Sequence, residues 1–306
     1  MSDVTLPLGY AQARTLVRSA FALEPTRVRR LSAQDTVVYR VETPAGSFVL
    51  RSHGRESDAE IASVPLWLEA LRVDGIDAPE PIRARDGGFV AERCTLVRFV
   101  PGRIHRGTPR LVHFERLGRT MAALHRHAEA WTPPPTFIRP SWRAAEVFCE
   151  AGRSLPPGRD PWALVPPALE PLLRDATERA RGPLDEAPAL LIHADLHLGN
   201  VVFAGGAATP FDFDDTGYGP LGYDVACALS KQRPTTAWPR VLDRFRRGYG
   251  AVRDGPDLSQ LDAYIAGRLA GIVLWLLSTA ETEPRVRAGL VKWIPHFEDQ
   301  LRLLRT

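Results

Sequence analysis

The sequence LLIHADLHLGNVVFAGGAATPFDFDD, residues 190–215, decides how the rest of the chain is interpreted. Its apolar start predicts a buried strand, and a polar loop follows at residues 193–200. Two apolar stretches then flank a pair of glycines at 205 and 206, which is the pattern of a β-hairpin. The segment therefore predicts a strand, a polar loop and a hairpin in direct succession.

Three polar residues of this segment have a spacing that suits phosphoryl transfer. Asp195 and Asn200 stand five positions apart on the loop, and the hairpin should return Asp212 to the same end. In this reaction a carboxylate accepts the proton of the attacking hydroxyl, and a protein mostly positions and neutralises charge. The pattern H-x-D-x-x-x-x-N followed by a later aspartate is that of the kinase catalytic loop. It makes Asp195 the base and makes Asn200 and Asp212 the ligands of Mg²⁺, which prefers oxygen atoms.

The same residues allow two other interpretations. Asp, Asn and Gly are common in loops because they tolerate turns and bond to their own backbone, so part of the pattern can be plain loop composition. His193, Asp195 and His197 alternate along the chain and could share one strand face, which would suit a zinc hydrolase. That interpretation leaves Asn200 and Asp212 without a role.

The motifs HADLHLGN (193–200), FDFDD (211–215) and GPLGYDVA (219–226) together resemble the aminoglycoside phosphotransferase superfamily. Within it they are most similar to the branch of type II homoserine kinases and the bacterial stress-response Ser/Thr kinase. The resemblance implies an α+β, protein-kinase-like bilobal fold, with an antiparallel β-sheet N-lobe and a mainly helical C-lobe. It also implies ATP and Mg²⁺ as cofactors and a hydroxyl group as the phosphate acceptor.

Four further polar residues are assigned supporting parts. The resemblance implies that Asp224 holds the catalytic loop by hydrogen bonds and is not itself catalytic. His193 is expected to orient the loop backbone, and His197 either supports the loop or contacts the acceptor. Asp214 either faces the metal or the acceptor or, as the simpler expectation, closes a hydrogen-bonded turn.

The overall composition is that of an ordinary globular protein. The chain has 306 residues, 44% of them apolar and 25% charged, with a net charge of +3. So small a net charge gives no argument for nucleic-acid or membrane partners. Three widely spaced cysteines predict reduced thiols in a cytoplasmic protein. We expect no signal peptide, and the longest apolar run, about 272–277, is far shorter than a membrane span.

The first third of the chain is expected to bind the nucleotide. Residues 8–22 predict a helix, and residues 36–51 predict a β-hairpin after a polar turn at 32–35 that lacks a G-x-G-x-x-G motif. The second strand ends in Arg51, where kinases carry a phosphate-binding lysine. Arginine keeps the charge and binds phosphate in a bidentate way, although its reach and shape differ. We therefore expect Arg51 to contact the α- and β-phosphates.

The next helix, predicted over residues 57–72 with Pro65 inside it, departs from the kinase pattern. A kinase needs a glutamate on this helix to pair with the basic residue of the strand. Related sequences place that glutamate where this chain has Val64. Glu60, one turn earlier and on the same face, is the candidate replacement. The departure leaves open a pseudokinase that binds nucleotide without turnover.

Strands predicted over residues 82–84, 89–91 and 95–99 continue the sheet, and helical periodicity begins near Leu111. This change of pattern predicts an N-lobe at residues 1–99 that binds nucleotide. Residues 100–306 would then form a helical C-lobe with the catalytic loop and the acceptor site. In a kinase-like architecture the adenine would lie against the backbone of the hinge at Arg98, Phe99 and Val100.

The C-terminal two thirds of the sequence predict helices over residues 111–128, 142–152 and 162–181, and a helical remainder over 236–306. His125 and His127 close the first of these and are expected to be dipole partners or solvated groups. Trp142 and Arg143 could line the acceptor pocket or pack an irregular lid. The acceptor stays open among a small metabolite, an aminoglycoside and a protein Ser/Thr, and the oligomeric state and the choice of ATP or GTP are not indicated.

Overall fold

Residues 37–52 form the hairpin that the sequence predicts, in a computed structural model that describes residues 8–33, 37–54, 56–105, 107–149 and 160–305. Strand β2 (Val37–Thr43) pairs with β3 (Gly46–Ser52), and Thr43 stands opposite Gly46 across the turn. Gly46 has a φ of 121°, which a side chain would make costly. The turn therefore fixes the register that places Arg51 opposite Val38.

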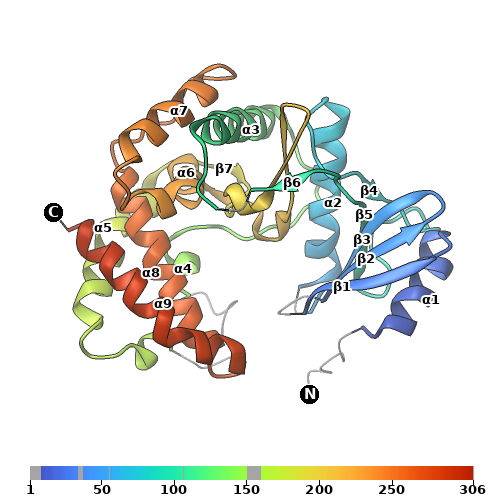
Figure 1. Ribbon diagram of the computed structural model, residues 1–306, viewed down its shortest axis with the longest axis horizontal. Helices are drawn as coiled ribbons and strands as arrows, with labels where there is room; N and C mark the ends of the chain where they lie inside the picture. The colour runs from blue at the N-terminus through green and yellow to red at the C-terminus, as the bar shows by residue number, and fades with distance from the viewer. Residues whose placement is uncertain (1–7, 34–36, 55, 106, 150–159, 306) are drawn as a thin grey trace. The chain divides into compact units, whose positions relative to one another are not determined.

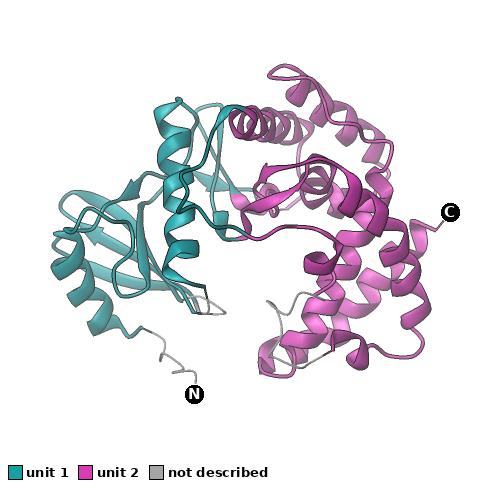
Figure 2. Ribbon diagram, turned by 180° about the vertical axis from the view of Figure 1, so that it is seen from behind, with its two compact units in different colours: residues 1–105, 130–139, 201–214 teal, residues 106–129, 140–200, 215–306 magenta. Residues whose placement is uncertain are grey.

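The chain divides into two compact units (Figure 2). Unit 1 consists of residues 1–105, 130–139 and 201–214. Unit 2 consists of residues 106–129, 140–200 and 215–306. The range expected for the N-lobe falls in unit 1, which also takes in two later segments of the chain. The functional division at residue 99 stays a prediction.

Unit 1 contains an antiparallel sheet of five strands in the order β1-β2-β3-β5-β4. The outer strands are β1 (Arg27–Ala33), β4 (Pro81–Ile82) and β5 (Cys94–Arg98). Helix α1 (Tyr10–Phe21) packs against this sheet (Figure 1) and buries Leu16, Val17 and Phe21 together with Tyr39, Val41, Phe48, Leu50 and Leu96. The apolar residues of the strands and helix thus form one core.

Two parts of the sheet differ from the sequence prediction. Strand β1 was not expected, because three of its seven residues are arginines and its side chains are mostly exposed at the edge of the sheet. The prediction of a strand at residues 89–91 is wrong. That segment makes only an isolated bridge between Ala91 and Cys94, since Glu92 and Arg93 turn the chain with positive φ.

Unit 1 also contains helix α2 (Asp58–Val73), as expected, and a small second sheet. Strands β6 (Arg103–Ile104), β8 (Val201–Ala204) and β9 (Ala207–Pro210) form this sheet in the order β6-β8-β9. Val201 pairs with Pro210, so the predicted hairpin brings the chain back to the level at which β8 begins. Gly205 and Gly206 make its turn with positive φ.

Unit 2 is mainly helical. Its helices are α3 (Leu111–Ala130), α4 (Ala144–Val147), α5 (Glu170–Glu186), α6 (Leu221–Leu229), α7 (Trp238–Gly250), α8 (Leu261–Thr279) and α9 (Pro284–Leu303). Strand β7 (Ala189–Ile192) pairs with β10 (Gly217–Pro220) in an antiparallel sheet, and short 3-10 turns cover 161–164, 198–200, 213–215 and 230–232.

The helices expected over residues 142–152 and 162–181 are placed differently. Helix α4 covers only Ala144–Val147, and residues 150–159 lie outside the described part of the chain. The second helix begins at Glu170, after a 3-10 turn, and extends to Glu186. Pro166 and Pro167 explain the late start, because proline lacks an N–H and restricts the residue before it.

Helix α8 forms the centre of unit 2. It runs beside α5, α6 and α9 (Figure 1), and most of its residues are buried. Among the described residues it is the helix that is long and apolar enough to cross a membrane, but 78% of its apolar stretch is buried inside the fold. A helix that is apolar all round is typical of a protein interior, so we identify α8 as a core helix.

Two glycines allow α3 and α7 to pack closely. A Cβ added at Gly248 would overlap the carbonyl oxygen of Glu115, and one added at Gly118 would overlap that of Phe245. At both points one helix backbone lies directly against the other. This contact sets the position of Tyr249, the residue after Gly248, relative to α3.

We expect Gly248→Ala to lower the free energy of unfolding by about 1–3 kcal/mol, because the added methyl overpacks the contact between the helices. Gly250→Ala is the matched control: a Cβ there meets no atom within 4 Å. It should change stability by no more than about 0.5 kcal/mol. The midpoint of urea unfolding measures both. Equal midpoints for the two variants would contradict the close packing.

Candidate active site

A buried carboxylate holds the polar loop after β7. The backbone N–H groups of His193 and Ala194 donate to the carboxylate of Asp224, at 3.3 and 2.8 Å. Asp224 lies in the first turn of α6 and is fully buried. Ala194 has a φ of 63°, a left-handed conformation that alanine rarely adopts. The hydrogen bonds expected between Asp224 and the loop are therefore present, and they fix the backbone next to Asp195.

His125 of α3 extends this network, which the sequence did not predict. Its Nε2 lies 2.9 Å from Asp224 Oδ2, and its Nδ1 lies 2.7 Å from Tyr249 Oη. Burial raises the pKa of Tyr249 to about 12, so the phenol keeps its proton. The expectation of a solvated histidine was wrong for His125 and for His127, since both side chains are buried. Isolated histidines near a helix end do not reveal partners that lie about 100 residues away.

The carboxylate of Asp195 is held on both of its oxygens. Asn200 Nδ2 donates to Asp195 Oδ2 at 2.8 Å and to the Asp195 carbonyl oxygen at 2.9 Å. Arg268 Nη2 donates to Asp195 Oδ1 at 2.5 Å. These contacts orient the predicted base, and the amide nitrogen of Asn200 faces Asp195, so its amide oxygen is the atom suited to a metal.

Arg268 was missed in the sequence, although a signal for it exists. It is the only cationic residue in the apolar helix α8, and a cation in the middle of a core helix indicates a buried partner. Burial acts to lower the pKa of Arg268, but its neighbours Cys227, Tyr223, Asp195 and Asp215 raise it well above the usual value. The guanidinium is therefore a permanent positive charge beside Asp195.

His197 lies on the same loop but is less closely bound to Asp195. Its Nε2 is 4.0 Å from Asp195 Oδ2, and its Nδ1 accepts a hydrogen bond from Gly199 N at 3.0 Å. Burial lowers the pKa of His197, so the imidazole is neutral near pH 7. The sequence left two roles open for His197, support of the loop and contact with the acceptor. These contacts favour support of the loop.

Unit 1 gathers a second set of expected residues around Arg51. Its Nη2 lies 2.7 Å from Asp212 Oδ1, and its Nη1 forms an ion pair with Asp214. The Arg51 side chain is 19% exposed and that of Asp212 is 39% exposed, so the aspartate remains accessible. Asp212 has a φ of 64°, which aspartate tolerates better than most residues.

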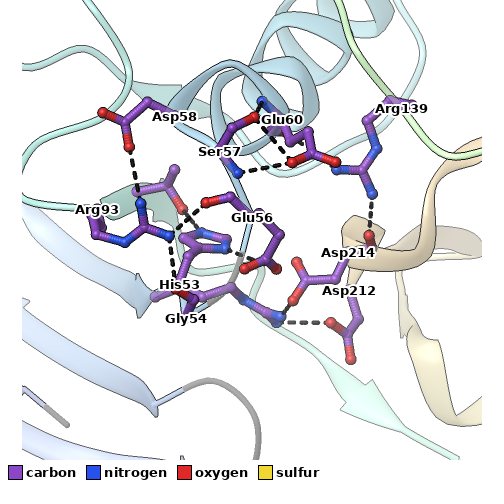
Figure 3. A network of polar contacts seen from close by, with 12 residues as sticks. His53, Gly54, Glu56, Ser57, Asp58, Glu60, Arg93, Arg139, Asp212 and Asp214 are labelled. Carbon is purple, nitrogen blue, oxygen red and sulfur yellow. Dashed lines mark hydrogen bonds and ion pairs between the residues drawn. The ribbon is translucent and has the colours of Figure 1, made fainter. Parts of the chain in front are cut away.

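Arg139 connects the Asp212–Asp214 segment to helix α2 (Figure 3). Its guanidinium donates to the carbonyl oxygen of Glu60 at 3.2 Å and to that of Asp214. Phe213 packs edge-on against Trp67 of α2, with ring centroids 5.5 Å apart. The segment is thus fixed to α2 by both polar and apolar contacts.

Glu60 takes part in a helix cap. Its Oε2 accepts hydrogen bonds from the backbone N–H and the hydroxyl of Ser57, at 2.8 and 3.0 Å, and Ser57 Oγ accepts from Glu60 N at 3.3 Å (Figure 3). This is a capping box, which satisfies N–H groups at the start of α2. The expectation that Glu60 pairs with Arg51 stays a prediction.

The expected hinge residues contribute to the sheet of unit 1. The backbone N–H of Arg98 donates to Glu80 O at 2.7 Å, and that of Phe99 donates to Ser47 O at 2.9 Å. The Arg98 side chain pairs with Glu80 at 2.5 Å. The backbone N–H groups of Arg98 and Phe99 are therefore occupied within this unit, and the adenine contact expected from the backbone at Arg98, Phe99 and Val100 stays a prediction.

Trp142 and Arg143 make packing contacts in unit 2. Trp142 Nε1 donates to Asp215 O at 2.6 Å, and its ring stacks on Tyr223. Arg143 Nη1 donates to the carbonyl oxygens of Leu184, Asp185 and Ala187 at the end of α5. The bonds from Arg143 satisfy carbonyl groups that a helix end leaves open. For both residues the contacts agree with a packing role, which was the alternative to lining the acceptor pocket.

Oxygen donors suited to Mg²⁺ are present at the expected positions in each unit. Asn200 directly precedes β8, and Asp212 follows β9 by two residues. Within the described ranges, no cluster of three or more His, Cys, Asp or Glu side chains could hold a metal. The zinc alternative, which required His193, Asp195 and His197 together, gains no support. Amide and carboxylate oxygens are the kinds of ligand that Mg²⁺ prefers, so each residue by itself is suited to the metal, and their assignment to one ion stays a prediction.

A family model establishes the class of protein that this fold and site define. Residues 27–264 match the model of the phosphotransferase enzyme family, and the chain belongs to that family. The homoserine kinase of Nitrobacter winogradskyi is 29% identical over 202 residues, which are 63% of this chain and 59% of that protein. The homoserine kinase of Azorhizobium caulinodans is 30% identical over 200 residues, 62% of this chain and 56% of that protein. The chain thus spans less than two thirds of the length of these relatives.

Solved structures confirm the expected fold class. A microcompartment-associated aminopropanol kinase superposes with a TM-score of 0.77 at 23% identity, over 96% of this chain and 95% of that one. The amicoumacin kinase hAmiN, in complex with AMP-PNP, Ca²⁺ and Ami, superposes with a TM-score of 0.74 at 18% identity, over 95% of this chain and 93% of that one. The chain has the kinase-like fold, with an antiparallel N-terminal sheet followed by a mainly helical region.

The network before α2 predicts a specific loss of stability in acid. His53 Nδ1 lies 3.8 Å from Glu56 Oε1, and the interaction with His53 lowers the pKa of Glu56 to about 2. A carboxylate with a lowered pKa stabilises the folded state above its ordinary pKa of 4.5, and this contribution is lost as the pH falls toward about 2. Burial also lowers the pKa of His53. The folded state therefore loses further stability as the pH falls below 6.5, the ordinary pKa of this group.

We therefore expect Glu56→Gln to lose less stability than the wild type between pH 4.5 and about 2, as measured by thermal unfolding at each pH. Glu69→Gln is the control, because it removes an exposed ion pair between Glu69 of α2 and Arg83. It should keep the wild-type dependence on pH. A wild-type slope in Glu56→Gln would show that Glu56 has an ordinary pKa in the folded state.

Proposed function

We propose that this chain is a kinase that transfers the γ-phosphoryl group of ATP to a hydroxyl group of a small molecule. The observation that carries the proposal is the geometry of the loop at residues 193–200. There the carboxylate of Asp195 is oriented by Asn200 and Arg268, while Asp224 fixes the backbone beside it. Family membership supports the same class of reaction.

In this mechanism Asp195 is the general base. Its carboxylate accepts the proton of the acceptor hydroxyl as the acceptor oxygen bonds to the γ-phosphorus and the bond to the bridging oxygen of ADP breaks. Arg268 and Asn200 keep the carboxylate in one orientation, so less of the barrier is spent on ordering it. General base catalysis of this kind contributes about 10²–10⁴-fold.

The remaining residues would bind and neutralise the nucleotide. Asn200 Oδ1 and the Asp212 carboxylate would hold Mg²⁺, which would neutralise charge on the phosphates. Arg51 supplies the positive charge for the α- and β-phosphates, and backbone groups at Arg98, Phe99 and Val100 would contact the adenine. Bound AMP-PNP in the amicoumacin kinase and bound ADP in a spectinomycin phosphotransferase support an adenine nucleotide as the donor.

The acceptor that we propose is a small metabolite that carries a hydroxyl group near an amine. The relatives named homoserine kinase and the similar aminopropanol kinase support this choice. An aminoglycoside-type antibiotic and a protein Ser/Thr are the other outcomes of an acceptor screen. A cytoplasmic location stays a prediction.

A second candidate is a pseudokinase that binds nucleotide without turnover. Two observations favour it: Arg51 replaces the usual lysine, and Val64 stands where the helix carries a glutamate in kinases. It shares the nucleotide site with the first proposal but predicts no phosphorylated product. Turnover of any acceptor excludes it.

We expect Asp195→Asn to lower kcat by at least about 10²-fold, because the amide cannot accept the hydroxyl proton. Nucleotide affinity should change little, since Asp195 is assigned to the acceptor. Steady-state kinetics and calorimetric binding of ADP measure the two effects. A parallel loss of ADP binding and turnover would show that Asp195 does not act as the base.

Arg268→Met should lower kcat by about 10- to 100-fold and leave the KM for ATP near the wild-type value, because the base loses one of its two donors. Asp262→Asn is the control on the same helix. It removes a partly exposed pair with Arg233 whose nitrogen–oxygen distance is 2.7 Å. A rise in the KM for ATP with kcat unchanged would instead assign Arg268 to the nucleotide.

A further inference from the structure

The basic residue of β3 requires a partner that fixes its direction. Kinases supply it as a glutamate on the helix after this strand, and the resulting ion pair must be in place for activity. This chain has Val64 at that helical position. An arginine on a flexible stem loses side-chain entropy when it binds phosphate, and a fixed partner reduces that loss. In this chain another carboxylate would have to fix the direction of the Arg51 side chain.

The contacts of Arg51 identify Asp214. One nitrogen of the guanidinium, Nη1, pairs with the Asp214 carboxylate, and the other, Nη2, lies 2.7 Å from Asp212 Oδ1. The Arg51 and Asp214 side chains are 19% and 27% exposed, so water screens their interaction less than it screens a surface pair. Charge-assisted hydrogen bonds of this kind are short and directional.

Asp214 is itself held in place. Its carbonyl oxygen accepts a hydrogen bond from Arg139, whose guanidinium also reaches the Glu60 carbonyl oxygen of α2 at 3.2 Å (Figure 3). Its neighbour Phe213 packs against Trp67 of α2 with ring centroids 5.5 Å apart. The Asp214 contact therefore couples strand β3 to helix α2, which is the coupling that the missing glutamate makes in kinases.

We propose that Asp214 is the positioning residue for Arg51 and replaces the helix glutamate. Asp214 directs the guanidinium toward the α- and β-phosphates, while Asp212 is left to bind the metal. This inference rests on the proposed function. The competing assignment is that Asp214 is a further metal ligand, which makes a different prediction for binding in the absence of metal.

The test is a double-mutant cycle on ADP binding with EDTA present, measured by calorimetry on the full chain. We expect Asp214→Asn to weaken metal-free ADP binding about tenfold, equivalent to about 1.4 kcal/mol. In an Arg51→Met background the same substitution should have no further effect, because there is no guanidinium left to position. Asp214→Glu keeps the charge and should recover most of the affinity.

Glu69→Gln is the matched control. It removes an exposed pair with Arg83 in the same unit, at 2.6 Å, and should leave ADP binding unchanged. Thermal unfolding of each variant checks that the fold persists, and the Arg51→Met background keeps the test valid if Asp214→Asn alone is unstable.

Three results would overturn the inference. Wild-type ADP affinity in Asp214→Asn without metal, together with a higher Mg²⁺ requirement for turnover, would make Asp214 a metal ligand. Additive effects of the two substitutions would show that Asp214 and Arg51 act independently. No ADP binding by the wild type in EDTA would overturn this inference alone, and no binding in Mg²⁺ either would overturn the proposed function with it.

Discussion

The candidate site depends on the hydrogen bonds between the buried carboxylate of Asp224 and the backbone of the loop. It accepts hydrogen bonds from the backbone of His193 and Ala194 and lies 2.9 Å from His125. A buried N–H without a partner costs about 1–3 kcal/mol, and the left-handed conformation of Ala194 adds about 1–2 kcal/mol. Without this carboxylate the loop would relax, and Asp195 would lose its defined position. The close packing of α3 and α7 serves the same end, because it places Tyr249 against His125.

Arginine supplies the positive charge beside the expected site residues in each of the two units. The chain has only two lysines, Lys231 and Lys292, and neither lies near the expected nucleotide residues in the sequence. Arg268 holds Asp195 in unit 2, and Arg51 pairs with Asp212 and Asp214 in unit 1. The planar guanidinium can bind two oxygens at once, so one arginine can orient two carboxylates. This geometry explains how the chain could dispense with a glutamate at position 64.

Local sequence patterns predicted much of the fold, but they could not predict contacts between residues that are far apart in the sequence. The strand before His193 and the hairpin after Asn200 follow from apolar runs and glycine turns. Strand β1 escaped prediction because its arginines lie at an exposed sheet edge. Arg268 and His125 escaped it because their partners lie 73 and 99 residues away in the sequence. The roles of the expected site residues stay predictions.

The most direct test of the kinase assignment is ³¹P NMR of the wild-type chain with ATP, Mg²⁺ and a panel of acceptors. The panel should contain amino alcohols, hydroxy amino acids, an aminoglycoside and a Ser/Thr protein. We expect ADP and a new phosphomonoester to appear together, and only when an amino alcohol or a hydroxy amino acid is present. ATP that stays intact with every acceptor would contradict the account.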